Sequence, residues 1–136
     1  MIQYLLDTNI CVFYLRGKLS FNQVLTNNWR SICCISEITV LELYYGAKNS
    51  NNPEKHRQAV DFFLENIIVL PVSSCTAMYA QNKVYFCKMG KPLHDEFDLI
   101  IGSTATANHL TLVTDNVKHF KDFPSLKIEN WAEKLP

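Results

Sequence analysis

The chain has 136 residues, 48% of them apolar, and its 13 basic residues balance its 13 acidic residues. This length and composition are typical of one domain whose core needs no disulfide or structural metal. A formal net charge of zero excludes a uniformly cationic coat, so any contact with nucleic acid must come from a local patch. We therefore expect residues 1–136 to form a single domain.

The sequence carries no feature of export or membrane insertion. Its apolar runs are shorter than the roughly 20 residues that cross a bilayer, and the first segment meets Asp7 before any basic residue. The five cysteines include no Cys-x-x-Cys pair, which favours buried, reduced thiols over a zinc site. We expect a cytoplasmic protein.

Strand and helix patterns alternate along the chain. In chain order they predict a strand at 2–6, helices at 8–15 and 20–28, a strand at 31–35, helices at 36–48 and 53–66, a strand at 67–72, helices at 73–89 and 95–108, and strands at 110–114 and 127–129. This alternation predicts an α/β fold, a three-layer α/β/α sandwich around a mainly parallel sheet. Ligand sites in such sheets lie beyond the carboxyl ends of the strands.

Two aspartates near predicted helix starts are candidate site residues. Asp7 ends the first predicted strand, although aspartate there is also a favoured helix N-cap. Asp98 lies early in the 95–108 helix, on a face that continues through small and apolar residues, so we expect it to point inward. The alternative is that Asp98 only completes the helix start. Asp95 and Glu96 suit that capping role better, and we expect both to point outward.

Glu42 is the third candidate. It shares a predicted helix face with Ile38, Leu41 and Tyr45, and no cation stands three or four residues after it. A glutamate within an apolar stripe is rarely buried without a partner. A helix-edge ion pair or a side chain that reaches solvent are the alternatives. Glu37 lies in the first turn of the same helix, where the helix dipole favours acids, so we interpret it as structural.

The end of the 110–114 strand carries further polar residues. Thr114 is followed by Asp115 and Asn116, a pair that commonly forms a turn. Because this strand end and Asp7 are expected at the same sheet edge, one of the pair is a candidate to reach the acids.

Several inward carboxylates repel one another unless a cation neutralises them. Oxygen ligands without paired Cys or His suit Mg²⁺ or Mn²⁺ rather than zinc. Such an ion lowers the pKa of a bound water and holds a phosphodiester oxygen. The four histidines share no metal-ligand spacing. His94, near Asp98, could be a catalytic histidine, but we favour a residue of a surface loop. The acids therefore predict metal-dependent phosphodiester cleavage.

The remaining charge leaves room for a nucleic-acid contact. Without Asp7, Glu42 and Asp98, the 13 basic residues face 10 acidic ones (13 minus 3). Each candidate phosphate contact is equally explained as a solvated surface charge. The candidates are Arg16, Lys18, Lys48, Lys91 and Lys118.

Taken in order, these motifs resemble the PIN-domain family and, within it, the VapC-type ribonuclease toxins of bacterial toxin–antitoxin pairs. The resemblance covers nearly the whole chain. It is carried by Leu5-Leu-Asp-Thr-Asn9, by the segment 35–46 with Glu42, by Gly90-Lys-Pro92, by Asp98-Leu-Ile-Ile-Gly-Ser-Thr-Ala105 and by Leu112-Val-Thr-Asp-Asn116, and it closes with Phe120 and Ile128-Glu-Asn-Trp131.

The resemblance implies a catalytic site and a reaction. Mg²⁺ or Mn²⁺ would be held by Asp7 and Asp98 with Glu42 as third member, and Asn9 would help to order the site. Water activated at the metal would cleave RNA, with transfer RNA a familiar target, to 5′-phosphate and 3′-hydroxyl ends. A VapB-type antitoxin partner and a homodimer are also implied.

The sequence departs from the family pattern at two points. Gly102-Ser103 replaces the usual alanine pair after the third acid, a change we expect to be mild. The family's fourth acidic position falls on Asn116, and Asp115 lies one residue earlier, so the role of each stays open.

The sequence leaves open one alternative function and the place of three aromatic residues. The chain could be a catalytically inert PIN-like module that binds RNA or an antitoxin, although all three principal acids are present. Tyr44, Tyr45 and Phe62 could serve partner contacts, but we favour a place for them in the core.

Overall fold

The structure is a computed structural model that describes residues 1–21, 28–91 and 95–134. Most of the helix predicted at 20–28 lies outside these residues. The strands are β1 (Tyr4–Leu6), β2 (Cys33–Ser36), β3 (Ile68–Leu70), β4 (Thr111–Val113) and β5 (Lys127–Glu129). The helices are α1 (Thr8–Leu15), α3 (Trp29–Ile32), α4 (Glu37–Lys48), α5 (Pro53–Glu65), α6 (Thr76–Lys88), α7 (Glu96–Ala107) and α8 (Val117–Phe120), with short 3₁₀ turns η1 (Val72–Cys75) and η2 (Trp131–Lys134).

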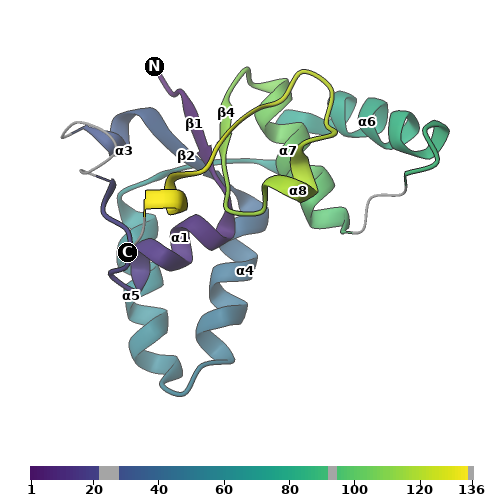
Figure 1. The fold of residues 1–136 in the computed structure, drawn as a ribbon. Coiled ribbons are helices and arrows are strands. Elements are labelled where there is room, and N and C mark those ends of the chain that lie inside the picture. The colour runs from purple at the N-terminus through teal and green to yellow at the C-terminus, as the bar shows by residue number, and fades with distance from the viewer. Residues whose placement is uncertain (22–27, 92–94, 135–136) are drawn as a thin grey trace.

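The five strands form one parallel sheet in the order β3-β2-β1-β4-β5. Helices cover both faces of this sheet (Figure 1). The predicted three-layer α/β/α sandwich is therefore confirmed. The pairing of Leu6 with Val113 fixes the register of β1 and β4, the two central strands whose ends carry candidate site residues.

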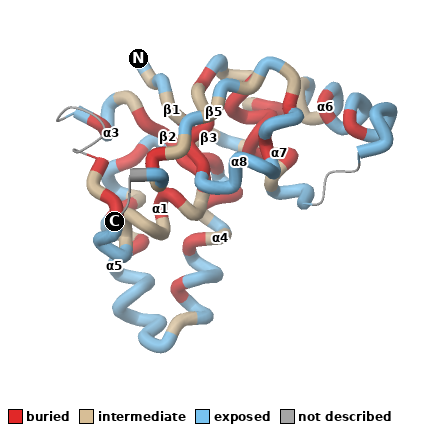
Figure 2. Tube along the Cα trace, in the orientation of Figure 1, coloured by how far each residue is buried: buried red, intermediate tan, exposed pale blue. Residues whose placement is uncertain are grey.

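The three inner strands, β2, β1 and β4, are largely buried, and alternate residues of β1 and β2 belong to two separate cores. Leu6 and Cys33 belong to the core beneath α1, α4 and α5, whereas Leu5 and Cys34 belong to the core beneath α6 and α7. This division follows from the twofold alternation of side chains along a strand. Figure 2 shows the buried residues concentrated in the sheet and on the inward faces of the helices.

Two predicted strands shift in the structure. Ser31 and Ile32, predicted as strand, end the short helix α3, and β2 begins only at Cys33. The segment predicted as a strand at 67–72 shortens to β3, which lies at the sheet edge with Ile68 and Val69 exposed. Edge position explains the shortening, because β3 has a hydrogen-bonded neighbour on one side only.

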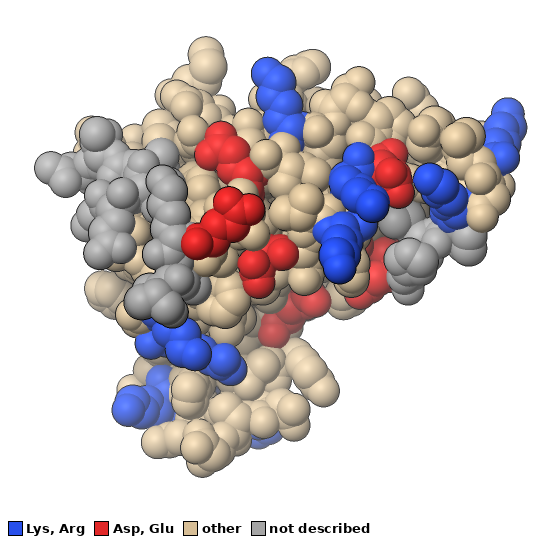
Figure 3. Space-filling view, viewed as in Figure 1, with Lys and Arg blue, Asp and Glu red and all other residues tan. Residues whose placement is uncertain are grey.

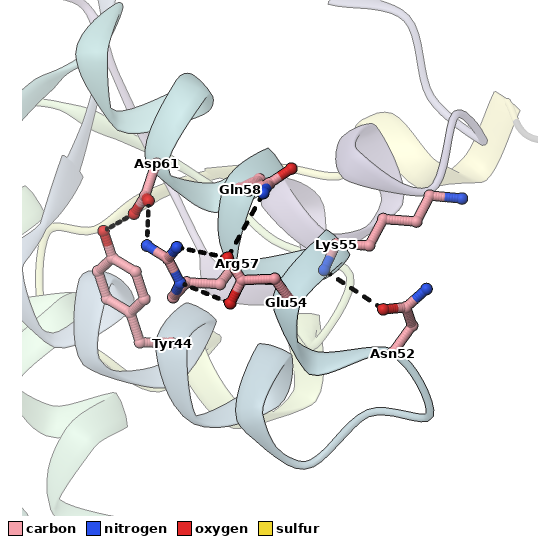
Figure 4. Close-up of polar contacts among 7 residues, drawn as sticks. All are labelled: Tyr44, Asn52, Glu54, Lys55, Arg57, Gln58 and Asp61. Atoms are coloured by element: carbon pink, nitrogen blue, oxygen red, sulfur yellow. Dashed lines mark hydrogen bonds and ion pairs between the residues drawn. The ribbon is translucent and has the colours of Figure 1, made fainter.

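Helices α4 and α5 form a hairpin that extends away from the sheet (Figure 1). Figure 4 shows the polar contacts on its surface: Tyr44 Oη donates to Asp61 Oδ1 at 2.6 Å, and Arg57 pairs with Asp61 and with Glu54 at 2.7 Å each. All these groups are exposed, so the ion pairs add little to stability. The hydrogen bond between Tyr44 and Asp61 joins α4 to α5, whereas both ion pairs lie within α5.

The placement of three aromatic residues in the core is wrong. Tyr44, Tyr45 and Phe62 are all exposed on α4 and α5, Tyr45 at 72% and Phe62 at 65%. In contrast, Trp29 and Trp131 are buried. All five cysteines are unpaired, and the expectation of buried thiols is confirmed for all except Cys87, which is exposed. Among the described residues, no helix has the length and apolar character needed to cross a membrane.

Candidate active site

The carboxyl ends of β1 and β4 bring Asp7 and Thr114 together across the sheet. The Asp7 N–H donates to Val113 O at 2.9 Å, which continues the β1–β4 pairing to this point. Thr114 Oγ1 donates to Asp7 Oδ2 at 2.7 Å, and the Asn116 N–H donates to Thr114 Oγ1 at 2.9 Å. Because the threonine hydroxyl accepts from Asn116, its own proton is directed at Asp7. The residues after β4 thus orient the carboxylate that follows β1.

Asp7 is also the N-cap of α1, the structural role that the sequence offers as the alternative to a site residue. Its Oδ1 accepts a hydrogen bond from the Thr8 N–H at 2.8 Å. The positive end of the α1 dipole therefore faces this carboxylate. With only 4% of its surface exposed, Asp7 is the most deeply buried acid at this sheet edge. Capping and a place in a functional site are compatible in this geometry.

Glu42 lies on α4 and points toward α1, where Thr8 Oγ1 donates to Glu42 Oε1 at 2.7 Å. The reason given for its inward position is wrong, because Leu41 and Tyr45 are exposed at 58% and 72% and form no buried stripe. Glu42 is half-buried through its contact with the start of α1 instead. Thr8 thereby links Asp7, through its backbone, with Glu42, through its side chain.

Asp98 lies in the first turn of α7 and faces the same edge of the sheet. Asp95 caps this helix, as predicted, by accepting from the Phe97 N–H at 2.8 Å. The expectation that Asp95 points only outward is wrong, since it also lines the cleft beside Asp98. Glu96 does point away and pairs with Lys83 at 3.0 Å. Glu37 is structural, as predicted, because its Oε1 accepts from the Val72 N–H at 2.7 Å.

These residues surround one cleft of about 360 Å³. Four carboxylates and no Lys or Arg contribute to the lining that the structure describes. On the face of the molecule that Figure 3 shows, acidic side chains gather across the middle and basic side chains lie on either side of them. The lining residues are Asp7, Thr8, Asn9, Val12, Phe13, Glu42, Asp95, Asp98, Asn116 and His119.

The structure separates the two residues that follow Thr114. Asn116 lines the cleft. Asp115 turns away and accepts from Asn130 Nδ2 at 3.2 Å. The family's fourth position therefore carries an amide here, and the neighbouring acid is engaged outside the cleft.

The cleft disfavours negative charge. Burial, supported by the charges of Asp98 and Glu42, raises the pKa of Asp7 from 3.8 to about 6, although the hydrogen bonds from Thr114 and Thr8 oppose this shift. Burial also raises the pKa of Glu42, and the charges of Asp95 and Asp98 add to the rise. Strongly perturbed acids in a cleft are typical of functional sites.

The donor set fits a hard divalent cation. It consists of oxygen atoms from carboxylates and an amide, the ligands that Mg²⁺ and Mn²⁺ prefer. Asn9 Oδ1, at the start of α1, is buried and, within the described part of the chain, has no hydrogen-bond partner. A buried polar oxygen of this kind normally has a partner. A cation would satisfy it and would relieve the repulsion between the acids.

Each of the three acids is engaged by a polar contact. Asp7 and Glu42 accept hydrogen bonds from threonines, and Asp98 Oδ2 lies 3.1 Å from His119 Nδ1. Within residues 1–21, 28–91 and 95–134, no three His, Cys, Asp or Glu side chains are grouped closely enough to hold an ion. Binding of one cation by all three acids would therefore require the carboxylates to move closer together.

Sequence reasoning missed two apolar residues of this cleft, Val12 and Phe13, and two polar ones, Thr8 and His119. Thr8 stands between Asp7 and Asn9 in the Asp-Thr-Asn motif, and this position was the available signal. His119 was set aside with the other histidines because no metal-ligand spacing includes it. Its distance from Asp98, 21 residues along the chain, gives no local pattern to detect. His94 lies outside the described residues.

A parallel α/β fold with a carboxylate-lined cleft at the strand ends defines a class of phosphodiester-cleaving nuclease, and comparison with known proteins agrees. The PIN domain model matches residues 4–126. The tRNA(fMet)-specific endonuclease VapC of Shigella flexneri is 32% identical over 97% of this chain and 100% of its own length. Ribonuclease VapC2 of Rickettsia felis is 34% identical, over 94% and 97%.

The fold of this chain is also that of one chain in a solved VapBC complex. A chain in the crystal structure of DNA-bound VapBC from Salmonella typhimurium superposes with a TM-score of 0.87 at 32% identity, covering 96% of this chain and 99% of that one. This chain belongs to the PIN-domain family and, within it, to the VapC ribonucleases.

Proposed function

We propose that this VapC ribonuclease is the toxin of a toxin–antitoxin pair and that its acidic cleft cleaves RNA with Mg²⁺ or Mn²⁺. The observation that carries the metal assignment is the lining of the cleft: four carboxylates, with no Lys or Arg among the described residues to balance them. The products would carry 5′-phosphate and 3′-hydroxyl ends. Residues 1–136 would act as one nuclease domain.

Asp7, Glu42 and Asp98 would hold the cation, with Asn9 Oδ1 as a further oxygen ligand or as a partner for a bound water. A divalent cation bound there supplies an acidified water and neutralises charge on the phosphodiester. Thr114 and Thr8 fix the plane of the Asp7 carboxylate, and Thr8 holds Glu42 toward it. Asn116, which also lines the cleft, would donate from its side-chain amide to a phosphate or ribose oxygen.

The RNA substrate has a polyanionic backbone and must nevertheless enter an acidic cleft. Basic side chains on both sides of the acids would hold the flanking phosphates (Figure 3). Arg16 is the best placed of the five candidates, because the adjoining pocket that it lines shares Val12 and Glu42 with the cleft. Lys91 is engaged at 3.8 Å by Asp122. The role of each basic residue is part of this proposal.

Transfer RNA is the first substrate to test, since a relative of the same length is a tRNA(fMet)-specific endonuclease. A VapB-type antitoxin is the proposed partner, because the similar Salmonella chain lies in a VapBC complex. The exposed Tyr45 and Phe62 are candidate contacts for that partner or for a second copy in a homodimer. We place the protein in the cytoplasm, where its unpaired thiols would stay reduced and RNA is abundant.

The test is cleavage of total bacterial RNA by the purified chain, freed of any antitoxin, followed by sequencing of the product 5′ ends. We expect discrete cuts with Mg²⁺ that disappear with EDTA and in Asp7→Ala. No cleavage by the folded wild-type protein would contradict the proposal and favour an inert binding module. Cuts that persist in EDTA would contradict the metal-dependent mechanism.

A further inference from the structure

The segment from Thr114 to Phe120 contacts two of the three acids. At its start, Thr114 Oγ1 donates to Asp7 Oδ2 at 2.7 Å. Five residues later, His119 Nδ1 lies 3.1 Å from Asp98 Oδ2. Asp7 and Asp98 come from different elements, the end of β1 and the first turn of α7. One short stretch of chain therefore reaches both.

The position of His119 is fixed by the elements around it. Its backbone N–H donates to the O atom of Asn116, the N-cap, at 3.0 Å, which closes the first turn of α8. The next residue, Phe120, is fully buried in the core beneath α6 and α7. His119 is itself half exposed, whereas the Asp98 side chain is 18% exposed. The backbone, rather than burial of the ring, thus aims the imidazole at Asp98.

A second contact runs parallel to the first, one helical turn along. Gly102 follows Asp98 by four residues on α7, and Phe123 follows His119 by four residues. A Cβ atom at position 102 would lie 2.5 Å from Phe123 Cε2, so the ring packs directly on the helix backbone. The glycine that departs from the family pattern therefore allows the close approach of α7 and the segment that carries His119.

We propose that His119 is a positioning residue for Asp98. The imidazole of His119 donates a hydrogen bond to the Asp98 carboxylate and holds it in the orientation that binds the cation. The inference rests on the proposed function of the cleft. A carboxylate that must choose among rotamers loses affinity for its ion, and partners behind metal ligands typically contribute 10- to 100-fold in affinity, to order of magnitude. No titration of His119 is needed, because only a donated N–H is required.

The test measures Mn²⁺ affinity of the full chain by calorimetry, apart from any cleavage. We expect His119→Ala to weaken binding by about 10- to 100-fold. The side-chain amide of Asn places a donor nitrogen where Nδ1 of histidine lies, so His119→Asn should restore affinity to within about threefold of wild type. In the cleavage reaction, His119→Ala should raise the Mn²⁺ concentration needed for half-maximal rate by a similar factor and leave KM for RNA nearly unchanged.

Lys121→Ala is the matched control, since it removes an exposed cation from the same stretch without touching the cleft. Unchanged or tighter Mn²⁺ binding by His119→Ala would overturn the proposal, because removal of a merely repelling cation strengthens metal binding. Failure of His119→Asn to restore affinity would overturn it as well. If wild-type protein neither binds Mn²⁺ nor cleaves RNA, the proposed function itself fails; if it does both and only the His119 effects are missing, the function stands.

Discussion

Two charged clusters on this molecule differ in how their charges are balanced. On the α4–α5 hairpin, Arg57 lies between Glu54 and Asp61 on the solvent-exposed surface (Figure 4), and its hydrogen bond and charge lower the pKa of Glu54. In the cleft, the carboxylates of Asp7 and Glu42 are withdrawn from water and their pKa values are raised. An exposed cluster whose acids are paired with an arginine needs no further explanation, whereas a buried cluster of acids without a paired Lys or Arg indicates that a cation belongs there.

The largest expected effect comes from removing one charge of the cleft. Asp98→Asn should lower RNA cleavage by at least about 100-fold, since loss of a metal ligand exceeds the loss of its supporting partner. Circular dichroism should show an unchanged fold. Glu96→Gln is the control on the same helix, because it removes an acid that faces Lys83 instead of the cleft. Equal losses in the two variants would mean that the cleft has no special role.

The second prediction concerns pH. The folded-state pKa of Asp7, about 6, lies above its ordinary value of 3.8, so its contribution to stability is fully present below pH 3.8 and is lost as pH rises through about 6. Without metal, Asp7→Asn should therefore match wild type near pH 3.8 and exceed its unfolding free energy by up to about 3 kcal/mol near neutral pH. Urea unfolding in EDTA across this range measures it. A difference that does not change with pH would contradict the assignment.

The third prediction concerns the contact beneath Asp98. Gly102→Ala should destabilise the protein by about 1–3 kcal/mol, because the added methyl group collides with Phe123. Gly46→Ala is its control: that helical glycine has no atom within 4 Å of the added Cβ, and the change should stabilise by up to about 1 kcal/mol. Thermal unfolding of both variants decides it. If both substitutions stabilise, the close approach of α7 and Phe123 is not real.

The smallest effect is expected on the hairpin surface. Tyr44→Phe removes the hydrogen bond to Asp61 and should change the unfolding free energy by no more than about 0.5 kcal/mol, because the group is exposed. Cleavage should stay at the wild-type rate. A large loss of activity in Tyr44→Phe would show that the exposed cluster on the hairpin also takes part in function.

The sequence was sufficient for the sheet and for the positions of the acids. Strand–helix alternation predicts the layers, and Asp7 and Thr114 end strands that become neighbours. The local reason given for Glu42 was wrong, because helix periodicity does not reveal which face meets α1. The contact of His119 with Asp98 depends on how α8 packs on α7, a tertiary relation that no spacing encodes. The aromatic residues of α4 and α5 were misplaced because composition alone does not separate a core from a partner surface.

The metal-binding role of the cleft carboxylates is tested most directly by the unfolding free energies of wild type and Asp7→Asn near neutral pH, each measured with EDTA and with excess Mn²⁺. A reversal is expected: Asp7→Asn is the more stable protein in EDTA by up to about 3 kcal/mol. Wild type alone gains with Mn²⁺, by about 4.1 kcal/mol at 1,000 times the dissociation constant, and becomes the more stable protein. If Mn²⁺ stabilises both proteins equally, or if Asp7→Asn is the less stable protein in EDTA, the carboxylates of the cleft are not the metal site described here.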